Sequence, residues 1–458
     1  MVPHQPALRL SPNAGYKITL RRAGFTVQPA HLFLSELIKM NKRLFIVFIL
    51  GFSSGLPMSL ISSTLQAWYA YSGMSVLATG ALSLVSLPYA YRIFWGPVLD
   101  RYSLFALGKR RSWILTMQFL LLVGFNFMAW FTPEQYPGFL AFLALILACF
   151  SATQDVAIDA HRAEYLPVTE HALGASLAVF GYRLALLLSG GFALIMAEKM
   201  GWAFTYRFMG LVMGIGMVAV LFSREPSIEI KEKSSFAYSF IAPIKELFSR
   251  PKIIYLLLFI FCYKLGEAFT TTTSGIVMPF LIQGIGFSLD TIGYVNKMLG
   301  VGSILLGGLT AGFILMRYSL YCSLFSFGLL QALTNVLFVA LAMVGKNVTL
   351  LSVAVVSDNF AAGMGSTALV ALFMRLVNKQ FTGTQFSMLV ALSTLPRIMS
   401  GPVAATIQMN IGWVGLYQLS IVFALAFIPF LILIKDETKE RKQEEVQLEK
   451  EGTLNPIR

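Results

Sequence analysis

Ionisable side chains interrupt the hydrophobic segments of this sequence at several points. Asp155 and Asp159 lie within an apolar run that begins at Leu140, and Arg183 lies within the next apolar run. A charge in hydrocarbon costs from roughly 2.5 to more than ~10 kcal/mol, so such residues normally face a partner or a water-filled cavity. Because Asp155 and Asp159 are four residues apart, they share one face of a helix. Acids and an arginine in such places predict proton transfer, or binding of a charged solute, inside a membrane.

The second half of the chain carries a similar set. Lys264 and Glu267 share a helix face, about half-way along a span that begins after Lys252 if each residue adds ~1.5 Å. Two interpretations remain open: an internal ion pair, or a Glu267 carboxyl group that takes up and releases a proton while Lys264 modulates it. Cationic groups at such depth suit a substrate that bears carboxylates. Further polar and charged candidates in later apolar runs are Asn296, Lys297, Asp358, Asn359 and Arg397.

The composition identifies the class of protein. Of 458 residues, 57% are hydrophobic and 12% charged, and the mean hydropathy is +0.72. A soluble domain averages about 25% charged residues. The chain is therefore an all-α polytopic membrane protein, in contact with a lipid bilayer. The net charge of +13 indicates basic cytoplasmic loops rather than a nucleic-acid partner.

The sequence contains no catalytic or metal-binding pattern. The three cysteines lie in apolar segments without metal or disulfide spacing, and neither a nucleophile elbow nor a phosphate loop is present. The four histidines lie in the N-terminal tail and in one polar connection. We predict that the protein is not an enzyme and that it has no metal and no cofactor.

About twelve membrane spans follow from the requirement for roughly 20 apolar residues each. Basic residues concentrate in the even-numbered connections and near both ends, which places both termini in the cytoplasm. Residues 223–251 are the longest polar interruption, with an apolar-basic piece from Phe236 to Phe248 that we interpret as an interfacial helix. The predicted spans are 44–70, 75–98, 113–131, 139–160, 172–197, 202–222, 253–282, 288–315, 320–343, 348–376, 382–408 and 413–434.

The spans form two halves with matching charges. An acid in the fourth span and an arginine in the fifth recur about 200 residues later as Asp358 and Arg397, which is typical of parallel repeats in major-facilitator transporters. We predict two pseudo-symmetric six-helix bundles. The predicted parts are an N-terminal tail (1–43), a first bundle (44–222), a linker (223–251), a second bundle (252–434) and a C-terminal tail (435–458); Met40 is a second possible start.

The connection between spans two and three resembles a signature of the major facilitator superfamily. The acid in this loop is expected to cap a neighbouring helix, and its basic residues to pair across the cytoplasmic face as a latch for the outward-facing state. An ordinary positively charged loop is the alternative. The residues concerned are Gly96, Asp100, Arg101, Gly108, Lys109, Arg110 and Arg111.

The first span ends in a polar tip that includes Gln66 and Trp68. Gly51, Gly55 and Pro57 precede this tip and allow either close helix packing or a bend. A buried amide needs hydrogen-bond partners, so we expect Gln66 to line a cavity.

Several ordered sequence pieces resemble the muropeptide permeases of the AmpG type from Gram-negative bacteria. They run from about residue 44 to 434 and include Gly51 to Pro57, Thr64 to Trp68, Ser151 to Asp155 with Asp159, Gly181 to Arg183, Tyr263 to Phe269, Val295 to Lys297, Gly363 to Gly365 and Thr384 to Phe386. The resemblance implies proton-driven import of N-acetylglucosamine–anhydro-N-acetylmuramic acid, with or without stem peptide, for peptidoglycan recycling, with a link to β-lactamase induction. Glu267 replaces an aspartate of some members, and the extra C-terminal spans of others are absent.

This resemblance implies an inner-membrane importer, and we expect a monomer. The candidate proton sites are Asp155, Asp159, Glu267 and Asp358. The candidate carboxylate-binding residues are Arg183, Lys264, Lys297 and Arg397. The candidate sugar- and amide-binding residues are Gln66, Trp68, Gln154, Tyr182, Asn296 and Asn359. The alternatives are a transporter of another anion such as acetyl-CoA, and a membrane sensor that binds cell-wall fragments without moving them.

Overall fold

The computed structural model describes residues 42–91, 99, 102–167, 170–225, 236–378 and 382–435. Gly96, Asp100 and Arg101 of the predicted latch, and residues 1–41 and 436–458 of the two tails, lie outside these residues. The described first half contains α2 (Lys42–Ser59), η1 (Leu60–Thr64), α3 (Leu65–Tyr71), α4 (Val76–Ala81), η2 (Leu82–Ser86), α5 (Leu87–Ala90), α7 (Lys109–Met128), α8 (Pro137–Tyr165), α9 (His171–Leu186), η5 (Leu187–Phe192), α10 (Ala193–Met200) and α11 (Trp202–Phe222).

The second half follows a helix, α12 (Phe236–Phe248), at the position predicted for the interfacial piece. Its elements are α13 (Ile253–Ala268), α14 (Val277–Pro279), η6 (Phe280–Gly284), α15 (Leu289–Ile292), η7 (Gly293–Leu299), α16 (Gly300–Arg317), α17 (Leu320–Val344), α18 (Val348–Leu376), α19 (Thr382–Leu425) and α20 (Phe427–Leu433). η1, η5, η6 and η7 are short π-helical turns, and η2 is a 3₁₀ turn.

Apolar length accounts for the membrane-spanning elements. Nine helices in the described residues are long and apolar enough to cross a membrane. The last of them, Thr384–Leu433, counts as two, because Gly412 breaks it with a φ of +72°. The shorter Val76–Ala90 and α13 lie at the positions of the second and seventh predicted spans, so each predicted span has a helix at its position. One prediction is wrong in detail: the expected continuous span 253–282 is interrupted between α13 and α14.

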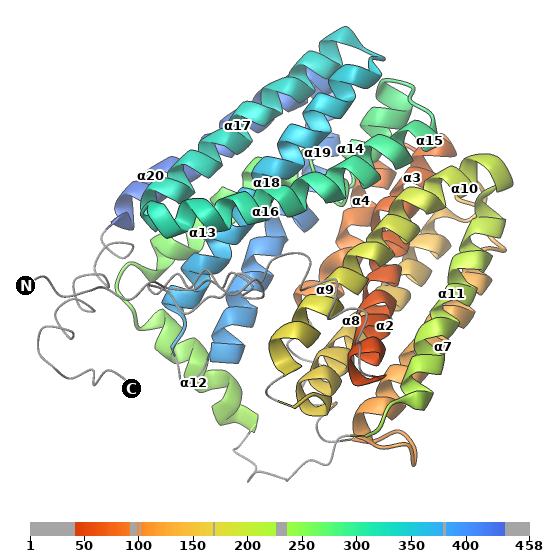
Figure 1. The fold of residues 1–458 in the computed structure, drawn as a ribbon. Helices are drawn as coiled ribbons and strands as arrows, with labels where there is room; N and C mark the ends of the chain where they lie inside the picture. Colours follow the sequence, from red (N-terminus) through yellow and green to blue (C-terminus); the bar gives the residue numbers. More distant parts are fainter. Residues whose placement is uncertain are drawn as a thin grey trace, which may run out of the picture.

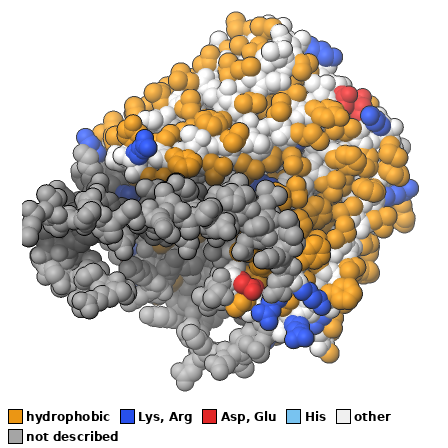
Figure 2. All heavy atoms as spheres, in the orientation of Figure 1, with side chains coloured by type: hydrophobic (Ala, Val, Ile, Leu, Met, Phe, Trp, Pro, Cys, Tyr) orange, Lys and Arg blue, Asp and Glu red, His pale blue; other side chains and the backbone are white. Residues whose placement is uncertain are grey.

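The helices pack as two bundles (Figure 1). In the first, α2 packs against α9, and α7 against α8 and α11; in the second, α16 packs against α18, and α13 and α17 against α19. Hydrophobic side chains cover much of the face in Figure 2, and Lys and Arg lie mainly at its margins. Side chains such as Leu211 and Leu309 are 63% and 64% exposed, as expected for a surface in contact with lipid.

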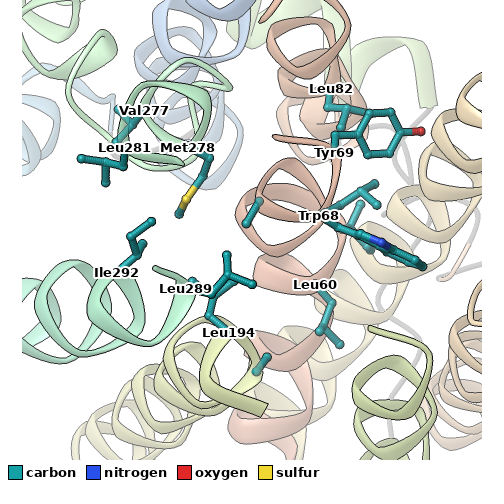
Figure 3. Close-up of a cluster of buried hydrophobic side chains, with 14 of the residues drawn as sticks. Leu60, Trp68, Tyr69, Leu82, Leu194, Val277, Met278, Leu281, Leu289 and Ile292 are labelled. Carbon is teal, nitrogen blue, oxygen red and sulfur yellow. The ribbon is translucent and has the colours of Figure 1, made fainter. Parts of the chain in front are cut away.

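The two bundles meet at the end of the molecule that carries α15, here named the α15 end. One hydrophobic core contains residues of both halves there. Figure 3 shows Leu60, Trp68 and Leu194 of the first half opposite Leu289 and Ile292 of the second. The other core clusters each lie within one half, toward the α12 end. The halves are therefore packed together at the α15 end and separate toward the α12 end.

Backbone contact closes the α15 end further. A Cβ atom added to Gly401 of α19 would lie 2.2 Å from the carbonyl oxygen of Gly80 in α4, so only glycine permits this approach. Gln283 Nε2 donates across the halves to the carbonyl oxygens of Ala70 and Met74, at 2.8 and 2.9 Å. The junction thus combines apolar packing with direct hydrogen bonds.

The described part of the latch forms contacts within the first half. Arg110 pairs with Glu164 of α8 at 2.6 Å. Glu225 accepts hydrogen bonds from the backbone N–H groups of Arg110 and Arg111, at 2.8 and 3.2 Å, and so caps the start of α7. Capping by Glu225 was not predicted, because Glu225 follows the sixth span and is far from this loop in sequence.

Candidate functional site

Two adjoining cavities lie between the bundles. The inner cavity has a volume of about 380 Å³ and the outer cavity, nearer the α12 end, about 440 Å³. Their shared walls are formed by Met58, Tyr182, Arg183, Thr394 and Arg397. The charged residues that the sequence placed inside apolar spans therefore face a common interior space, which is the physical condition for tolerating them.

Two arginines, one from each half, face both cavities. Arg183 comes from α9 and Arg397 from α19, at matching places of the two repeats. Among the described residues, neither guanidinium group has a side-chain or backbone acceptor, and Nε of Arg183 is buried without a partner. An Arg guanidinium offers five N–H donors in a planar fork that matches a carboxylate or phosphate. The arrangement is suited to an anionic ligand held between the halves.

Lys264 and Glu267 form an ion pair at the wall of the inner cavity. Lys264 Nζ lies 3.0 Å from Glu267 Oε1 and donates to Ser366 Oγ at 2.8 Å. The pair is mostly buried, with side chains 10% and 18% exposed. The geometry predicted by the ion-pair interpretation is present, and the proton-transfer role of Glu267 stays a prediction.

Asp358 is a buried carboxylate at the same wall. Its Oδ1 accepts hydrogen bonds from Thr270 Oγ1 at 2.9 Å, Gln331 Nε2 at 2.6 Å and Thr334 Oγ1 at 3.3 Å. No ion pair with Asp358 occurs within the described part of the chain. Neutral donors thus hold this carboxyl group in place, and a proton could neutralise it without breaking an ion pair.

Lys297 crosses from the second half to the first. It lies in the π-helical turn η7, and its Nζ donates to Ser63 Oγ at 2.7 Å and to Thr272 Oγ1 at 3.1 Å. The Lys297 side chain runs past Gly190, where an added Cβ would approach its Cδ to 3.2 Å. π-Helical turns are frequent at functional sites. Lys297 therefore borders the inner cavity and also joins the two halves.

The two aspartates of α8 lie in different surroundings. Asp155 borders the outer cavity and accepts a hydrogen bond from Ser54 Oγ at 2.6 Å. Asp159 lies at the mouth of this cavity, paired with Arg162 at 3.1 Å and 52% exposed. Asp159 is thus half exposed and ion-paired, unlike the buried carboxyl group that the apolar run suggested, and its role as a proton site stays a prediction.

Three predicted sugar-binding residues lie outside both cavities in this conformation. Trp68 stacks on Trp202 with centroids 5.5 Å apart, within the shared core. Gln154 donates from Nε2 to the carbonyl oxygen of Ser53 at 3.0 Å, between helices of the first half. Gln66 is fully buried, and neither of its amide atoms has a partner among the described residues. The structure corrects the expected cavity position of all three: Trp68 is held by ring stacking and Gln154 by a hydrogen bond between helices, and Gln66 is buried among helices with no amide partner in the described residues.

The other three predicted residues, Tyr182, Asn296 and Asn359, do line the inner cavity. Sequence reasoning missed a neighbouring set, the four consecutive threonines Thr270–Thr273, which also line it. The signal was a run of hydroxyl side chains that begins three residues after Glu267 in an otherwise apolar span. Within the described residues, no group of His, Cys, Asp and Glu side chains has the arrangement of a metal site.

The comparisons with known proteins agree with this architecture. Residues 44–401 match the family model of the Major Facilitator Superfamily. The anhydromuropeptide permease of Escherichia coli K12 is 38% identical over 398 residues, which cover 87% of this chain and 80% of that protein. The chain belongs to the anhydromuropeptide permeases of this superfamily. A further relative, putative transporter AmpG 4 of Rickettsia felis, is 30% identical over 403 residues, covering 86% and 96% of the two chains.

Solved structures show the same fold. A POT family transporter in complex with a thioalcohol-conjugated peptide superposes with a TM-score of 0.68 at 14% identity, covering 87% of this chain and 96% of that one. A bacterial homologue of the lysosomal transporter Spinster superposes with a TM-score of 0.64 at 13% identity, covering 86% and 96%. The chain is a membrane transporter and not an enzyme, as the sequence predicted.

Proposed function

We propose that this permease carries anhydromuropeptides across the bacterial inner membrane, from periplasm to cytoplasm, and that protons drive the movement. The observation that carries the proposal is the pair Arg183 and Arg397, one from each half, directed at one cavity and without an acceptor among the described residues. An anhydromuropeptide offers what such a cavity can bind: carboxylates for the guanidinium groups, and hydroxyl and amide groups for Tyr182, Asn296 and Asn359. The relative at 38% identity supports this substrate class.

Charge and closure together support an orientation of the chain in the membrane. Lys109, Arg110 and Arg111 lie at the α12 end, and basic residues accumulate on the cytoplasmic side. With that orientation both termini are cytoplasmic, and the closed α15 end faces the periplasm. The cavities then represent the inward-facing state, from which a bound substrate leaves for the cytoplasm, and rocking of the two halves reopens the site to the periplasm. One chain supplies both halves of the cavity, so transport needs no second copy, and we expect a monomer.

Proton coupling rests on Asp358 and Glu267, with Asp155 as a third candidate. Asp358 and Glu267 border the same cavity as the arginines. A proton on either carboxyl group leaves the arginines as the dominant charge in the cavity, which favours an anionic ligand. Loss of the proton on the cytoplasmic side restores a negative charge beside the ligand and promotes its release. Delivery of such products to the cytoplasm is also the step that would link the chain to β-lactamase induction.

Transport by purified protein in proteoliposomes tests the function. Labelled N-acetylglucosamine–anhydro-N-acetylmuramic acid should accumulate when an inward proton gradient is imposed, and should exchange with unlabelled substrate in counterflow. An excess of unlabelled disaccharide should compete, and acetyl-CoA should not. Competition by acetyl-CoA alone would reassign the cavity to another anion, and binding without counterflow would show a sensor.

A further inference from the structure

The helix that carries Lys264 and Glu267 is broken where it reaches the floor of the inner cavity. α13 ends at Ala268 and α14 begins at Val277, and the residues between them are not helical. Backbone groups within a membrane must be satisfied, so an irregular segment at this depth persists only where it is buried in protein or lines a water-filled space. Here Thr270–Thr273, which we name the threonine break, line the inner cavity.

The threonine break offers uncharged hydrogen-bonding groups to this cavity. Thr271, Thr272 and Thr273 are partly exposed, and the hydroxyl groups of Thr271 and Thr273 lie 3.5 Å apart. Among the described residues, the backbone N–H groups of Thr272 and Thr273 have no backbone acceptor. Hydroxyl groups both donate and accept, so this strip matches the hydroxyl and acetamido groups of a sugar ring.

Contacts on both sides hold the strip in position. Thr270 Oγ1 donates to Asp358, and Thr272 Oγ1 accepts from Lys297. Gly275, with a φ of +85°, passes so close to Gly80 of the other half that an added Cβ would lie 2.7 Å from its carbonyl oxygen. A strip fixed at both ends is preorganised, which lowers the entropic cost of binding.

We propose that the threonine break is the subsite for the neutral sugar portion of the ligand, while Arg183 and Arg397 bind its carboxylate. This inference rests on the proposed function and divides the cavity into a cationic region and an uncharged polar region. The hydroxyls of Thr271 and Thr273 carry the recognition, because among the described residues they contact only each other, at a long 3.5 Å, whereas those of Thr270 and Thr272 are held by Asp358 and Lys297.

The test replaces Thr271 and Thr273 by valine, singly and together, which removes the hydroxyl group and keeps the shape. Uptake of labelled N-acetylglucosamine–anhydro-N-acetylmuramic acid is measured in proteoliposomes as KM and kcat. KM should rise roughly fivefold to tenfold in the double variant, with little change in kcat, because neutral hydrogen bonds are lost in binding. Competition by unlabelled N-acetylglucosamine should weaken in parallel. Serine at both positions should restore KM.

Thr310→Val is the matched control, since this threonine is partly exposed on α16, as Thr271 and Thr273 are in the break, and among the described residues its hydroxyl bonds only to the Leu306 carbonyl within its own helix. An unchanged KM in the double variant, an equal rise in Thr310→Val, or a loss confined to kcat would overturn the subsite. If a valine variant does not elute as folded protein in size-exclusion chromatography, alanine replaces threonine at Thr271 and Thr273. The same changes in KM and kcat then decide the result. Absence of disaccharide uptake by the unaltered protein would overturn the proposed function, and the subsite with it.

Discussion

Lys297 Nζ donates to Ser63 Oγ at 2.7 Å, so a buried cation of the second half hydrogen-bonds to the first. This bond exists only while the α15 end is closed. Replacing Lys297 by Met should weaken closure and open the α15 end. Spin labels at Lys199 and Ser288, on opposite halves, should then report a longer distance in a variant without the native cysteines. An unchanged distance distribution would show that apolar packing alone keeps this end closed.

The close contact between Gly80 and Gly401 leads to a second prediction about closure of the α15 end. A methyl group at Gly401 meets backbone and cannot be relieved by a side-chain rotation. Gly401→Ala should therefore reduce uptake at least tenfold and lengthen the distance between the same spin labels. Gly302→Ala is the control, because an added Cβ there has no neighbour within 4 Å. Normal uptake by Gly401→Ala would contradict a cycle that passes through this closed state.

The two cavity arginines are expected to contribute to binding rather than to folding. A hydrogen bond to a charged group is worth ~1.5–3 kcal/mol, which corresponds to roughly a 10- to 100-fold change in affinity. Arg397→Gln and Arg183→Gln should each raise the KM for the labelled disaccharide by about that factor. Arg317→Gln, at the end of α16, serves as the comparison. The idea fails if KM stays within twofold while the amount of folded protein falls.

The two carboxyl candidates for coupling are separable from substrate binding by experiment. Asp358→Asn and Glu267→Gln should abolish uptake driven by a proton gradient, because an amide cannot take up and release the proton. A variant that has lost only proton coupling should still exchange labelled for unlabelled substrate in counterflow. Asp290→Asn, in the α15 turn, should leave both activities intact. Full gradient-driven uptake by a variant would remove that residue from the coupling role.

Glu246 of α12 provides a prediction about pH and stability. Burial raises the pKa of its carboxyl group, but hydrogen bonds from Arg250, Gln385 and Asn378 outweigh burial and hold the pKa below its ordinary value of 4.5. A carboxyl whose pKa is lowered by folding stabilises the protein above the unfolded-state pKa, and this contribution is lost as the pH falls through the folded-state pKa.

Glu246→Gln should therefore lower the melting temperature by roughly 1 to 3 °C near neutral pH. The difference from the unaltered protein should shrink as the pH falls below 4.5. Asp159→Asn, at a half-exposed pair, should have a smaller effect. A pH-independent difference would mean that packing of the side chain, and not its charge, stabilises α12.

The sequence predicted the cavity position of the charged residues, because these side chains cannot face lipid. Arg183, Asp358 and Arg397 must face a wet interior because a charge facing lipid is too costly. The same reasoning fails for Trp68, since an aromatic ring packs well in a core, and for Gln66, whose amide is buried without a partner among the described residues. The threonine break escaped notice because threonine is compatible with a membrane helix, and only the folded chain shows where that helix stops.

The apolar junction at the α15 end has a thermodynamic consequence for the working transporter. Each turnover must pull Leu60 and Leu194 away from Leu289 and Ile292 and wet the exposed surfaces. Wetting of such surfaces becomes easier on cooling, since hydrophobic attraction weakens at low temperature. In the proposed cycle, if the α12 end buries less apolar surface when it closes, the equilibrium should shift in the cold toward the form that is open at the α15 end, and the shift should carry a measurable heat-capacity change.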